Sequence, residues 1–237
     1  MRMDLVAGFC NSATMSTALI TGAGRGIGRE FCRQYSANGW RVIAVVRDND
    51  AHAELAALGI DARLLDVRDF PGIERLAASL HGEPIDLLIA NAGIYEGPDQ
   101  PLAALDPDFW LDAFRVNTMA PLLFARAFRA NVAASRERKA IAITSLLGSM
   151  SRNYRPGHYP YRTSKAALNA AWRGLAIEAP EIIAVLLRPG TVRTRMAGPD
   201  ALLTPEESVA HMRALIARLT PGDSGKFLDY SGQPTPW

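Results

Sequence analysis

The strongest constraint on the fold is a regular alternation between short apolar runs and segments of helical periodicity. Apolar runs of strand length cover residues 18–20, 42–46, 62–65, 86–90, 140–144, 182–187 and 227–230. The longest helical patterns lie between them, at residues 108–134 and 159–178. Strands that are apolar on both faces and alternate with helices are typical of a parallel sheet with right-handed crossovers. The sequence therefore predicts a doubly wound α/β fold, a mainly parallel sheet of about seven strands with helices on both faces.

Length and charge limit the class of protein. The 237 residues fit one α/β domain of ordinary composition, with 49% hydrophobic and 21% charged residues. No linker divides the chain, so residues 17–237 are expected to form a single domain. Residues 1–16 are expected to be a disordered leader, or else Met15 is the functional start. The net charge is only +2, whereas nucleic-acid-binding proteins usually carry a basic stripe, so no nucleic-acid partner is predicted.

The cysteine content and the hydropathy indicate the compartment. Cys10 and Cys32 are too few for a disulfide scaffold and lack metal-ligand spacing, so no metal site is predicted. No stretch is apolar for long enough to span a bilayer, and the run Leu5–Cys10 is shorter than a secretory signal usually needs. The sequence thus predicts a cytoplasmic protein with reduced thiols and no membrane partner.

A Gly-rich loop follows the first apolar run and opens an amphipathic helical pattern. Its sequence over residues 21–28 is Thr-Gly-Ala-Gly-Arg-Gly-Ile-Gly. Gly22 permits a sharp turn, Gly26 lets a pyrophosphate approach the backbone, and Gly28 lets the helix pack closely on the sheet. The helix N-terminus then offers free N–H groups and a positive dipole end to phosphates. The residues expected to bind a dinucleotide here are Gly22, Gly24, Arg25, Gly26, Ile27 and Gly28.

A tyrosine and a lysine are spaced for acid–base chemistry. Tyr161 and Lys165 form a Tyr-x-x-x-Lys pattern, and an i, i+4 spacing places both side chains on one face of a helix. The chain has only three lysines and uses arginine for most positive charges, so a lysine here suggests a need for a compact point charge. Ser145 ends the fifth apolar run, where open parallel sheets bind ligands, and Asn117 lies in the long helical stretch.

These motifs together resemble those of the short-chain dehydrogenases/reductases. The loop has the spacing Thr-Gly-x-x-x-Gly-x-Gly, and Asn117, Ser145, Tyr161 and Lys165 follow in the order of that family's catalytic four. The resemblance covers residues 17–237 and implies a Rossmann-type fold. It implies that Tyr161 acts as general acid and base and that Ser145 donates a hydrogen bond to the substrate oxygen. It also implies that Lys165 binds the nicotinamide ribose and that Asn117 takes part in a proton relay. Lys165 is also expected to lower the pKa of Tyr161.

The same resemblance extends the cofactor site along the sheet. Asp66 and Val67 match the family's adenine contact, and Pro189-Gly190-x-Val192-x-Thr194 matches the segment near the nicotinamide carboxamide. Arg195 stands where the family often has an acidic residue. The turn that flanks the cofactor matches at Asn91, Ala92 and Gly93.

The end of the second apolar run indicates which dinucleotide is preferred. Val46 occupies the position at which NAD-preferring members of the family resemble one another in having Asp. Arg47 occupies the next position, at which NADP-preferring members carry Arg. Arg25 is the second basic position of that pattern, and two guanidiniums can bind one phosphate. Asp48 remains an alternative, because its carboxylate could reach the ribose. NADP(H) is therefore favoured and NAD(H) is possible.

Two further segments resemble the sniffer-type carbonyl reductases and the C-factor-like bacterial proteins. They are residues 145–149 together with residues 159–169, and the ending at residues 225–232 with Trp237. This narrower resemblance implies a small carbonyl or alcohol substrate. The substrate side chains are expected after the fourth, fifth and sixth apolar runs, at Tyr95, Met150, Tyr154, Arg155, Tyr159 and Met196.

The sequence leaves two functions open. The first is an NADP-dependent carbonyl reductase or alcohol dehydrogenase, favoured because all four catalytic positions are intact. The second is a cofactor-binding signalling or regulatory protein on the same fold with little catalysis. A sugar-nucleotide epimerase fits poorly, because such enzymes need a larger C-terminal substrate region. The helical stretches 108–134 and 159–178 resemble the family's dimer surface, which implies a homodimer or tetramer.

Overall fold

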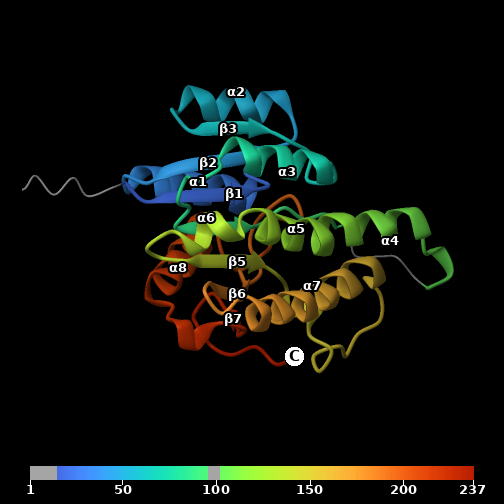
Figure 1. Cartoon of the computed structure of the whole chain (residues 1–237). Helices are drawn as coiled ribbons and strands as arrows, with labels where there is room; N and C mark the ends of the chain where they lie inside the picture. The colour runs from blue at the N-terminus through green and yellow to red at the C-terminus, as the bar shows by residue number, and fades with distance from the viewer. Residues whose placement is uncertain (1–14, 96–101) are drawn as a thin grey trace, which may run out of the picture.

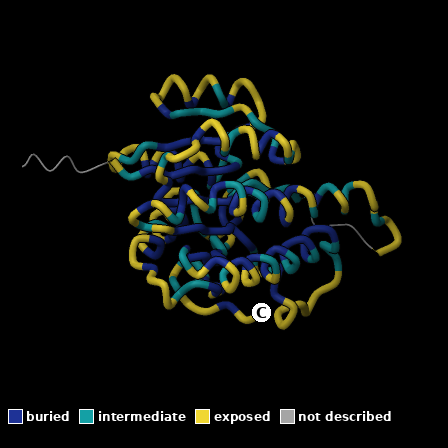
Figure 2. The backbone as a smooth tube through the Cα atoms, in the orientation of Figure 1, coloured by how far each residue is buried: buried dark blue, intermediate teal, exposed yellow. Residues whose placement is uncertain are grey.

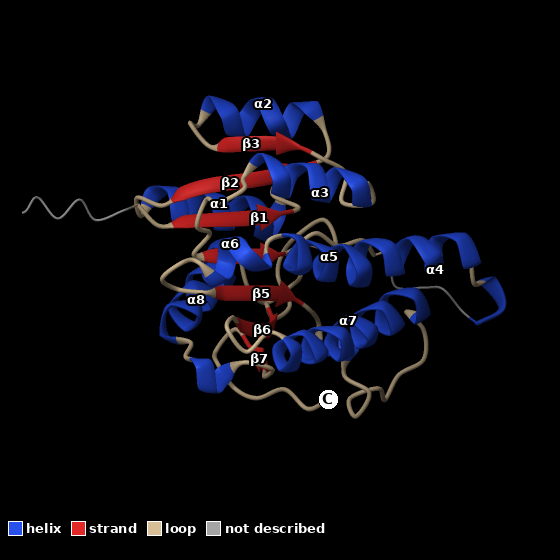
Figure 3. Ribbon diagram, in the orientation of Figure 1, coloured by secondary structure: helices blue, strands red, loops and turns tan. Residues whose placement is uncertain are grey.

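The computed structural model describes residues 15–95 and 102–237, so most of the expected leader lies outside the described residues. Seven strands form one sheet in the order β3-β2-β1-β4-β5-β6-β7, and every pair is parallel (Figure 3). The strands are β1 (Thr17–Thr21), β2 (Arg41–Val46), β3 (Asp61–Leu64), β4 (Leu87–Ala90), β5 (Lys139–Ile143), β6 (Ile183–Arg188) and β7 (Phe227–Asp229). The order of the first six strands is that of the Rossmann fold, which confirms the predicted fold class.

Helices cover both faces of the sheet (Figure 1). One face packs against α1 (Gly26–Ala37), α2 (Asn49–Ala57) and α8 (Pro205–Arg218). The other packs against α3 (Phe70–Ser79), α5 (Ala120–Ala127), α6 (Arg129–Ala133) and α7 (Tyr159–Glu178). Alternate residues of each strand enter the two cores, as Ile20 and Leu19 of β1 do. Strands β1 and β2 are accordingly buried, whereas the edge strand β3 is only partly buried and the outer side of α2 is exposed (Figure 2).

The helical stretch predicted at residues 108–134 is not one helix. It consists of α4 (Pro107–Phe114), a π-helical turn η2 (Arg115–Met119), α5 and α6. Pro121 stands in the first turn of α5, and the chain leaves helical geometry again at Phe128 between α5 and α6. The prediction of a helix over residues 159–178 is confirmed by α7. Asn117, one of the candidate catalytic residues, lies within the π turn, and such turns often occur at functional sites.

The sheet brings the segments that follow its strands to one side. Because all strands are parallel, their carboxyl ends meet at the same side, and the order reverses between β1 and β4. That reversal is the topological switch point at which open α/β sheets bind ligands. Short 3-10 turns occur at η1 (Leu102–Ala104) after β4 and at η3 (Leu146–Gly148) after β5, while η4 (Pro221–Asp223) precedes β7. Within residues 15–95 and 102–237, no helix combines the length and apolar character needed to cross a membrane.

Candidate active site

The Gly-rich loop joins β1 to α1 in a conformation that larger residues would oppose. Gly22 has φ +66°, and a Cβ there would lie 2.7 Å from Cα of Ala92. A Cβ at Gly28 would lie 2.2 Å from the carbonyl oxygen of Gly22. Arg25 precedes α1 with an extended backbone, and its side chain does not cap the helix. The loop therefore presents the first N–H groups of α1 toward the switch point, as a phosphate site requires.

The turn after β4 is tied directly to this loop. Both N–H groups of Asn91 and Ala92 donate to Oγ1 of Thr21, at 3.0 and 3.1 Å. The Asn91 side chain donates to the carbonyl oxygens of Thr21 and Gly22, at 3.0 and 3.2 Å. These bonds hold the carboxyl ends of β1 and β4 in a fixed relation, which is the position expected for a cofactor-flanking turn.

Arg25 and Arg47 stand on either side of the end of β2. Both are exposed, and within the described part of the chain neither makes an ion pair or a side-chain hydrogen bond. Asp48 is used differently from Arg47, because its carboxylate caps α2 by accepting the N–H of Ala51 at 2.9 Å. The Cβ position of Gly24 lies 3.7 Å from Oδ2 of Asp48, so the loop passes close to this strand end. This arrangement favours a ligand phosphate beside the two arginines.

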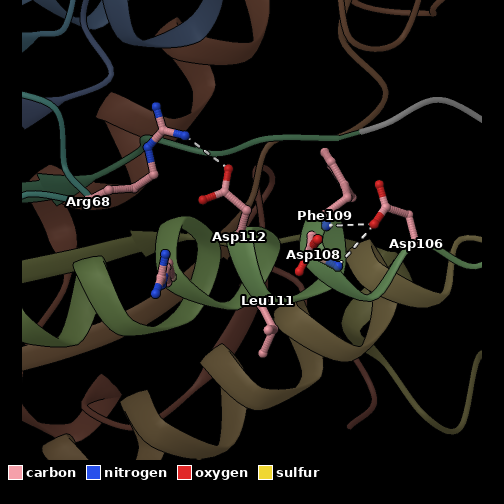
Figure 4. A pocket seen from close by; sticks show the side chains of 7 residues that line it. Arg68, Asp106, Asp108, Phe109, Leu111 and Asp112 are labelled. Carbon is pink, nitrogen blue, oxygen red and sulfur yellow. Dashed lines mark hydrogen bonds and ion pairs between the residues drawn. The ribbon is translucent and has the colours of Figure 1, made fainter.

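Asp66, after β3, is held by an arginine that the sequence analysis did not single out. Its carboxylate accepts from Nη2 of Arg68 at 2.6 Å, and this bond holds the pKa of Asp66 below its usual range. Arg68 also reaches Asp112 of α4 at 3.0 Å (Figure 4). Val67 between them is buried. A depression of about 450 Å³ is lined by Arg68, Asp106, Asp108, Phe109, Leu111, Asp112 and Arg115, and includes none of the four candidate catalytic residues.

Tyr161 and Lys165 lie one turn apart on the buried face of α7. The Lys165 ammonium is 5.8 Å from the centre of the Tyr161 ring. It donates to the carbonyl oxygen of Ile143, at the end of β5, at 2.8 Å. Burial lowers the pKa of Lys165 to about 8. The helix therefore brings a compact charge beside the phenol, as the spacing in the sequence predicts.

Asn117 links the π turn to the loop after β4. Its Oδ1 accepts the N–H of Ile94 at 2.8 Å, and its Nδ2 donates to the Ile94 carbonyl oxygen at 3.0 Å. A second bond from Nδ2 reaches Oγ of Ser164 on α7 at 3.0 Å. The Cβ position of Gly93 lies 3.3 Å from Oδ1 of Asn117 and 3.8 Å from Nζ of Lys165. Three distant parts of the chain thus meet at Gly93.

Ser145 stands two residues beyond β5 and is half-buried. Its Oγ accepts the N–H of Leu147 at 3.1 Å, which leaves the hydroxyl hydrogen for another acceptor. The neighbouring Thr144 donates to Oδ1 of Asn169 at 2.7 Å, and Asn169 donates to the Gly148 carbonyl oxygen at 3.2 Å. Asn169 is a supporting residue that the sequence analysis did not assign a role.

The loop after β6 reaches the phosphate loop from the other side. The methyl group of Thr194 lies 3.3 Å from the Cβ position of Gly26. The loop is anchored at its start, where Ser208 of α8 donates to the Pro189 carbonyl oxygen at 2.7 Å, and by Val192, which pairs with Leu203. Gly190, with φ +81°, makes the turn between them. The segment therefore lies against the Gly-rich loop at Gly26.

The expected substrate residues divide into three groups. Tyr95 lies in contact with Tyr161, at 5.1 Å between ring centres. Tyr154, Arg155 and Tyr159 share a depression of about 360 Å³ next to α7, in which Arg162 also takes part. Met150 and Met196 are 77% and 43% exposed, and neither lines that depression. His158, directly before α7, lies beside Tyr95, with 3.0 Å between its Nδ1 and the Tyr95 hydroxyl oxygen.

The fold and these residues define the class of protein, a dinucleotide-binding oxidoreductase with a tyrosine–lysine pair. The chain belongs to the short-chain dehydrogenase/reductase family, since the family model described as short chain dehydrogenase matches residues 16–201. C-signal from Myxococcus xanthus is 40% identical over 156 residues, which cover 65% of this chain and 93% of that relative.

Two solved structures extend the likeness over the fold. The carbonyl reductase Sniffer of D. melanogaster superposes with a TM-score of 0.87 at 30% identity, covering 94% of this chain and 100% of that one. The NADPH-bound carbonyl reductase from chicken fatty liver gives a TM-score of 0.86 at 31% identity, with 94% of each chain covered. The chain is thus a short-chain dehydrogenase/reductase of the carbonyl reductase type.

Proposed function

We propose that the protein transfers hydride between NADP(H) and a small carbonyl or alcohol compound, as a carbonyl reductase or alcohol dehydrogenase. The observation that carries the proposal is the buried pair of Tyr161 and Lys165, 5.8 Å from ammonium to ring centre, at the switch point of the sheet. A buried lysine without a carboxylate partner among the described residues is costly, so it indicates a chemical use for the charge.

The residues of the chain divide the work of the reaction. Tyr161 donates its phenolic proton to the carbonyl oxygen in reduction and accepts it in oxidation. The charge of Lys165 stabilises the phenolate that remains, and its ammonium is placed to donate to ribose hydroxyl groups. Ser145 directs its free hydroxyl hydrogen to the substrate oxygen, and Asn117 holds the Ile94 backbone in the relay region. The bound nicotinamide nucleotide supplies the hydride.

The cofactor is held by main-chain geometry and two arginines. A side chain at Gly22 would collide with Ala92, and one at Gly28 with the Gly22 carbonyl oxygen, so the glycines keep the loop in the conformation that offers its N–H groups to phosphates. Asp66 and Val67 flank the adenine, and Thr194 with Gly190 covers the nicotinamide end. Arg25 and Arg47 bind the 2′-phosphate, which is why NADP(H) is preferred over NAD(H). The capping bond from Ala51 to Asp48 supports this preference, because it draws that carboxylate toward α2.

The substrate opening is formed by the loops after β4, β5 and β6. Tyr95, Tyr159 and Tyr154 supply aromatic surface, Met150 and Met196 add apolar side chains, and Arg155 adds a positive charge. This set suits a small carbonyl compound with an apolar or aromatic substituent.

A binding titration with NADPH and NADH, followed by a carbonyl-reduction assay, tests the proposal. We expect tighter binding of NADPH, and an Arg47→Ala variant that weakens NADPH by about tenfold or more while leaving NADH unchanged. Arg29→Ala is the matched control, since Arg29 is also exposed but pairs with Glu54. If NADH binds as tightly as NADPH or more tightly, we would infer that Asp48 binds the ribose hydroxyl and that Arg47 does not select the cofactor. If neither nucleotide binds, the oxidoreductase proposal is wrong.

A signalling or regulatory role is the second candidate, favoured by the 40% identity to C-signal. The two candidates differ in the need for Tyr161. A protein that binds NADPH without reducing any aldehyde or ketone of a broad panel would support the regulatory role.

Association through the helices α4, α5 and α7 is a related proposal. Large apolar side chains on α4, on the adjoining turn η2 and on α7 face solvent in the single chain, with Leu111 63%, Met119 44% and Ile177 74% exposed. Burying them against a second copy would remove apolar area from water. Light scattering of the purified protein should give a dimer or tetramer, and Ile177→Glu should lower the oligomeric state.

A further inference from the structure

The segment that leads into α7 has an unusual backbone. Gly157 and His158 both have positive φ, +85° and +57°. Among the non-glycine residues that the structure describes, only His158 and Arg138 lie in this region. A side chain in the left-handed region is strained and persists where the surroundings fix it. The start of the helix that carries Tyr161 is therefore held in one conformation.

The buried side chain of Arg162 binds the backbone of this segment. Arg162 is nine-tenths buried and donates from Nε to the Gly157 carbonyl oxygen and from Nη2 to that of Arg155, both at 3.2 Å. Its own N–H donates to the His158 carbonyl oxygen at 2.7 Å. These bonds hold the backbone on both sides of His158, whose ring reaches the loop after β4, with Nδ1 3.0 Å from the Tyr95 hydroxyl.

Tyr95 is fixed from two directions. Its backbone follows Ile94, whose N–H and carbonyl are both bound by Asn117. Its hydroxyl is bound by His158. The ring between these anchors meets the Tyr161 ring edge to face, at 5.1 Å and an interplanar angle of 68°. This geometry is a favourable aromatic contact, and it limits the movement of the Tyr161 ring.

We propose that Tyr95 and His158 form a positioning pair that orients the ring of Tyr161. This inference rests on the proposed function, in which Tyr161 exchanges a proton with the substrate oxygen. Proton transfer depends on a heavy-atom approach within hydrogen-bond reach, so a small rotation of the phenol slows the reaction. The pair acts through Tyr161 and does not touch the reacting atoms.

Matched variants separate the hydrogen bond from the strained backbone. Tyr95→Phe keeps the ring and removes the hydroxyl. His158→Gly keeps the positive φ and removes the imidazole, whereas His158→Asn tolerates the same backbone and retains an acceptor. Arg138→Gly is the control, because it relieves the other left-handed residue at the opposite edge of the sheet.

Steady-state kinetics should show that the pair works as a unit. We expect Tyr95→Phe and His158→Gly each to lower kcat by about tenfold, with the KM for NADPH changed less than about twofold. The double variant should be no slower than the single ones, and His158→Asn should recover most of the rate. Arg138→Gly should keep the wild-type kcat. If the loss of kcat in the double variant equals the product of the two single losses, or if the single variants keep the wild-type kcat, the proposal is wrong.

A spectroscopic measurement tests the pair even without turnover. The ¹³Cζ signal of Tyr161, assigned with Tyr161→Phe, should shift in both Tyr95→Phe and His158→Gly and not in Arg138→Gly. A protein that binds NADPH, reduces no carbonyl compound and shows this shift would refute the proposed function and leave the positioning pair standing. A Tyr161 signal that neither variant moves would refute the pair, whatever the activity.

Discussion

In the proposed active site, the cofactor side and the substrate side are built by different means. The phosphate loop is held by backbone contacts: Gly22 and Gly28 are closely packed, and Asn91 binds two carbonyl oxygens of the loop. The proposed substrate opening offers side chains instead, and Met150 and Tyr154 are both 77% exposed. The first region resists substitution because packing and hydrogen bonds depend on it. The second can change its specificity without affecting the fold.

Tyr161 stands where the two regions meet, and its removal has the largest expected effect. Tyr161→Phe keeps the ring that packs against Tyr95 and removes only the acid–base hydroxyl. We expect kcat for carbonyl reduction to fall by about 100- to 10,000-fold. NADPH affinity, measured by fluorescence titration, should stay within about twofold of the wild type. A variant that retains most of its rate would assign the proton transfer to another group.

A side chain in the phosphate loop should damage both stability and binding. In Gly28→Val the Cβ would lie 2.2 Å from the Gly22 carbonyl oxygen, so the loop or the helix must move. We expect a loss of about 2–3 kcal/mol in the free energy of unfolding, with NADPH binding strongly weakened. Urea unfolding measures the first effect.

Gly174 provides the control for that substitution. It lies in α7, and nothing stands within 4 Å of its Cβ position. Gly174→Ala should therefore stabilise the protein by up to about 1 kcal/mol through helix propensity. If both glycine variants changed the free energy of unfolding by the same amount, the contrast between a packed loop and an open helix surface would be wrong.

The buried lysine predicts a pH dependence of stability in the protein without cofactor. Burial lowers the pKa of Lys165 from 10.5 to about 8, so between these values the unfolded chain holds the proton more often than the folded chain. The contribution of Lys165 to the free energy of unfolding therefore rises with pH across that window. Below pH 8 both states are protonated, and a penalty of up to about 3 kcal/mol is present in full.

Comparison with Lys165→Met isolates this contribution. The variant removes the titrating group, so its stability relative to the wild type should fall as the pH rises from 8 to 10.5. Urea unfolding of both proteins at several pH values measures the difference. A difference that stays constant with pH would show that Lys165 is not desolvated as the structure indicates.

The smallest effects on stability are expected at the substrate opening. Because Met150 and Tyr154 are exposed, Met150→Ala and Tyr154→Ala should each change the free energy of unfolding by less than about 0.5 kcal/mol. Their KM values for bulky carbonyl substrates should rise, while the KM for NADPH stays the same. Thermal unfolding and substrate kinetics on the same preparations check this. A large stability loss would show that these loops are as closely packed as the cofactor side.

The sequence was most informative where function depends on neighbours along the chain. The alternation of strand and helix patterns predicts a parallel sheet, because the periodicity of each element depends only on residues close together in the chain. The Gly-rich loop spans eight residues, and Tyr161 and Lys165 are one helical turn apart, so both were predicted from spacing. The boundaries of α7 were predicted for the same reason.

Tertiary structure determined the contacts between residues that are far apart in the chain. It divided the predicted helix over residues 108–134 by a π turn, and only the folded chain shows that Asn117 there binds Ile94. It engaged Asp48 in capping α2 and joined Arg68 to Asp112 across 44 positions.

The pairing of His158 with Tyr95 is the clearest case of the second kind. The two residues are 63 positions apart, and neither lies in a motif that specifies the other. Periodicity and spacing describe how a chain turns on itself within a few residues. Which side chains then meet depends on how whole elements pack, because contacts between them are set by the shape of the entire core.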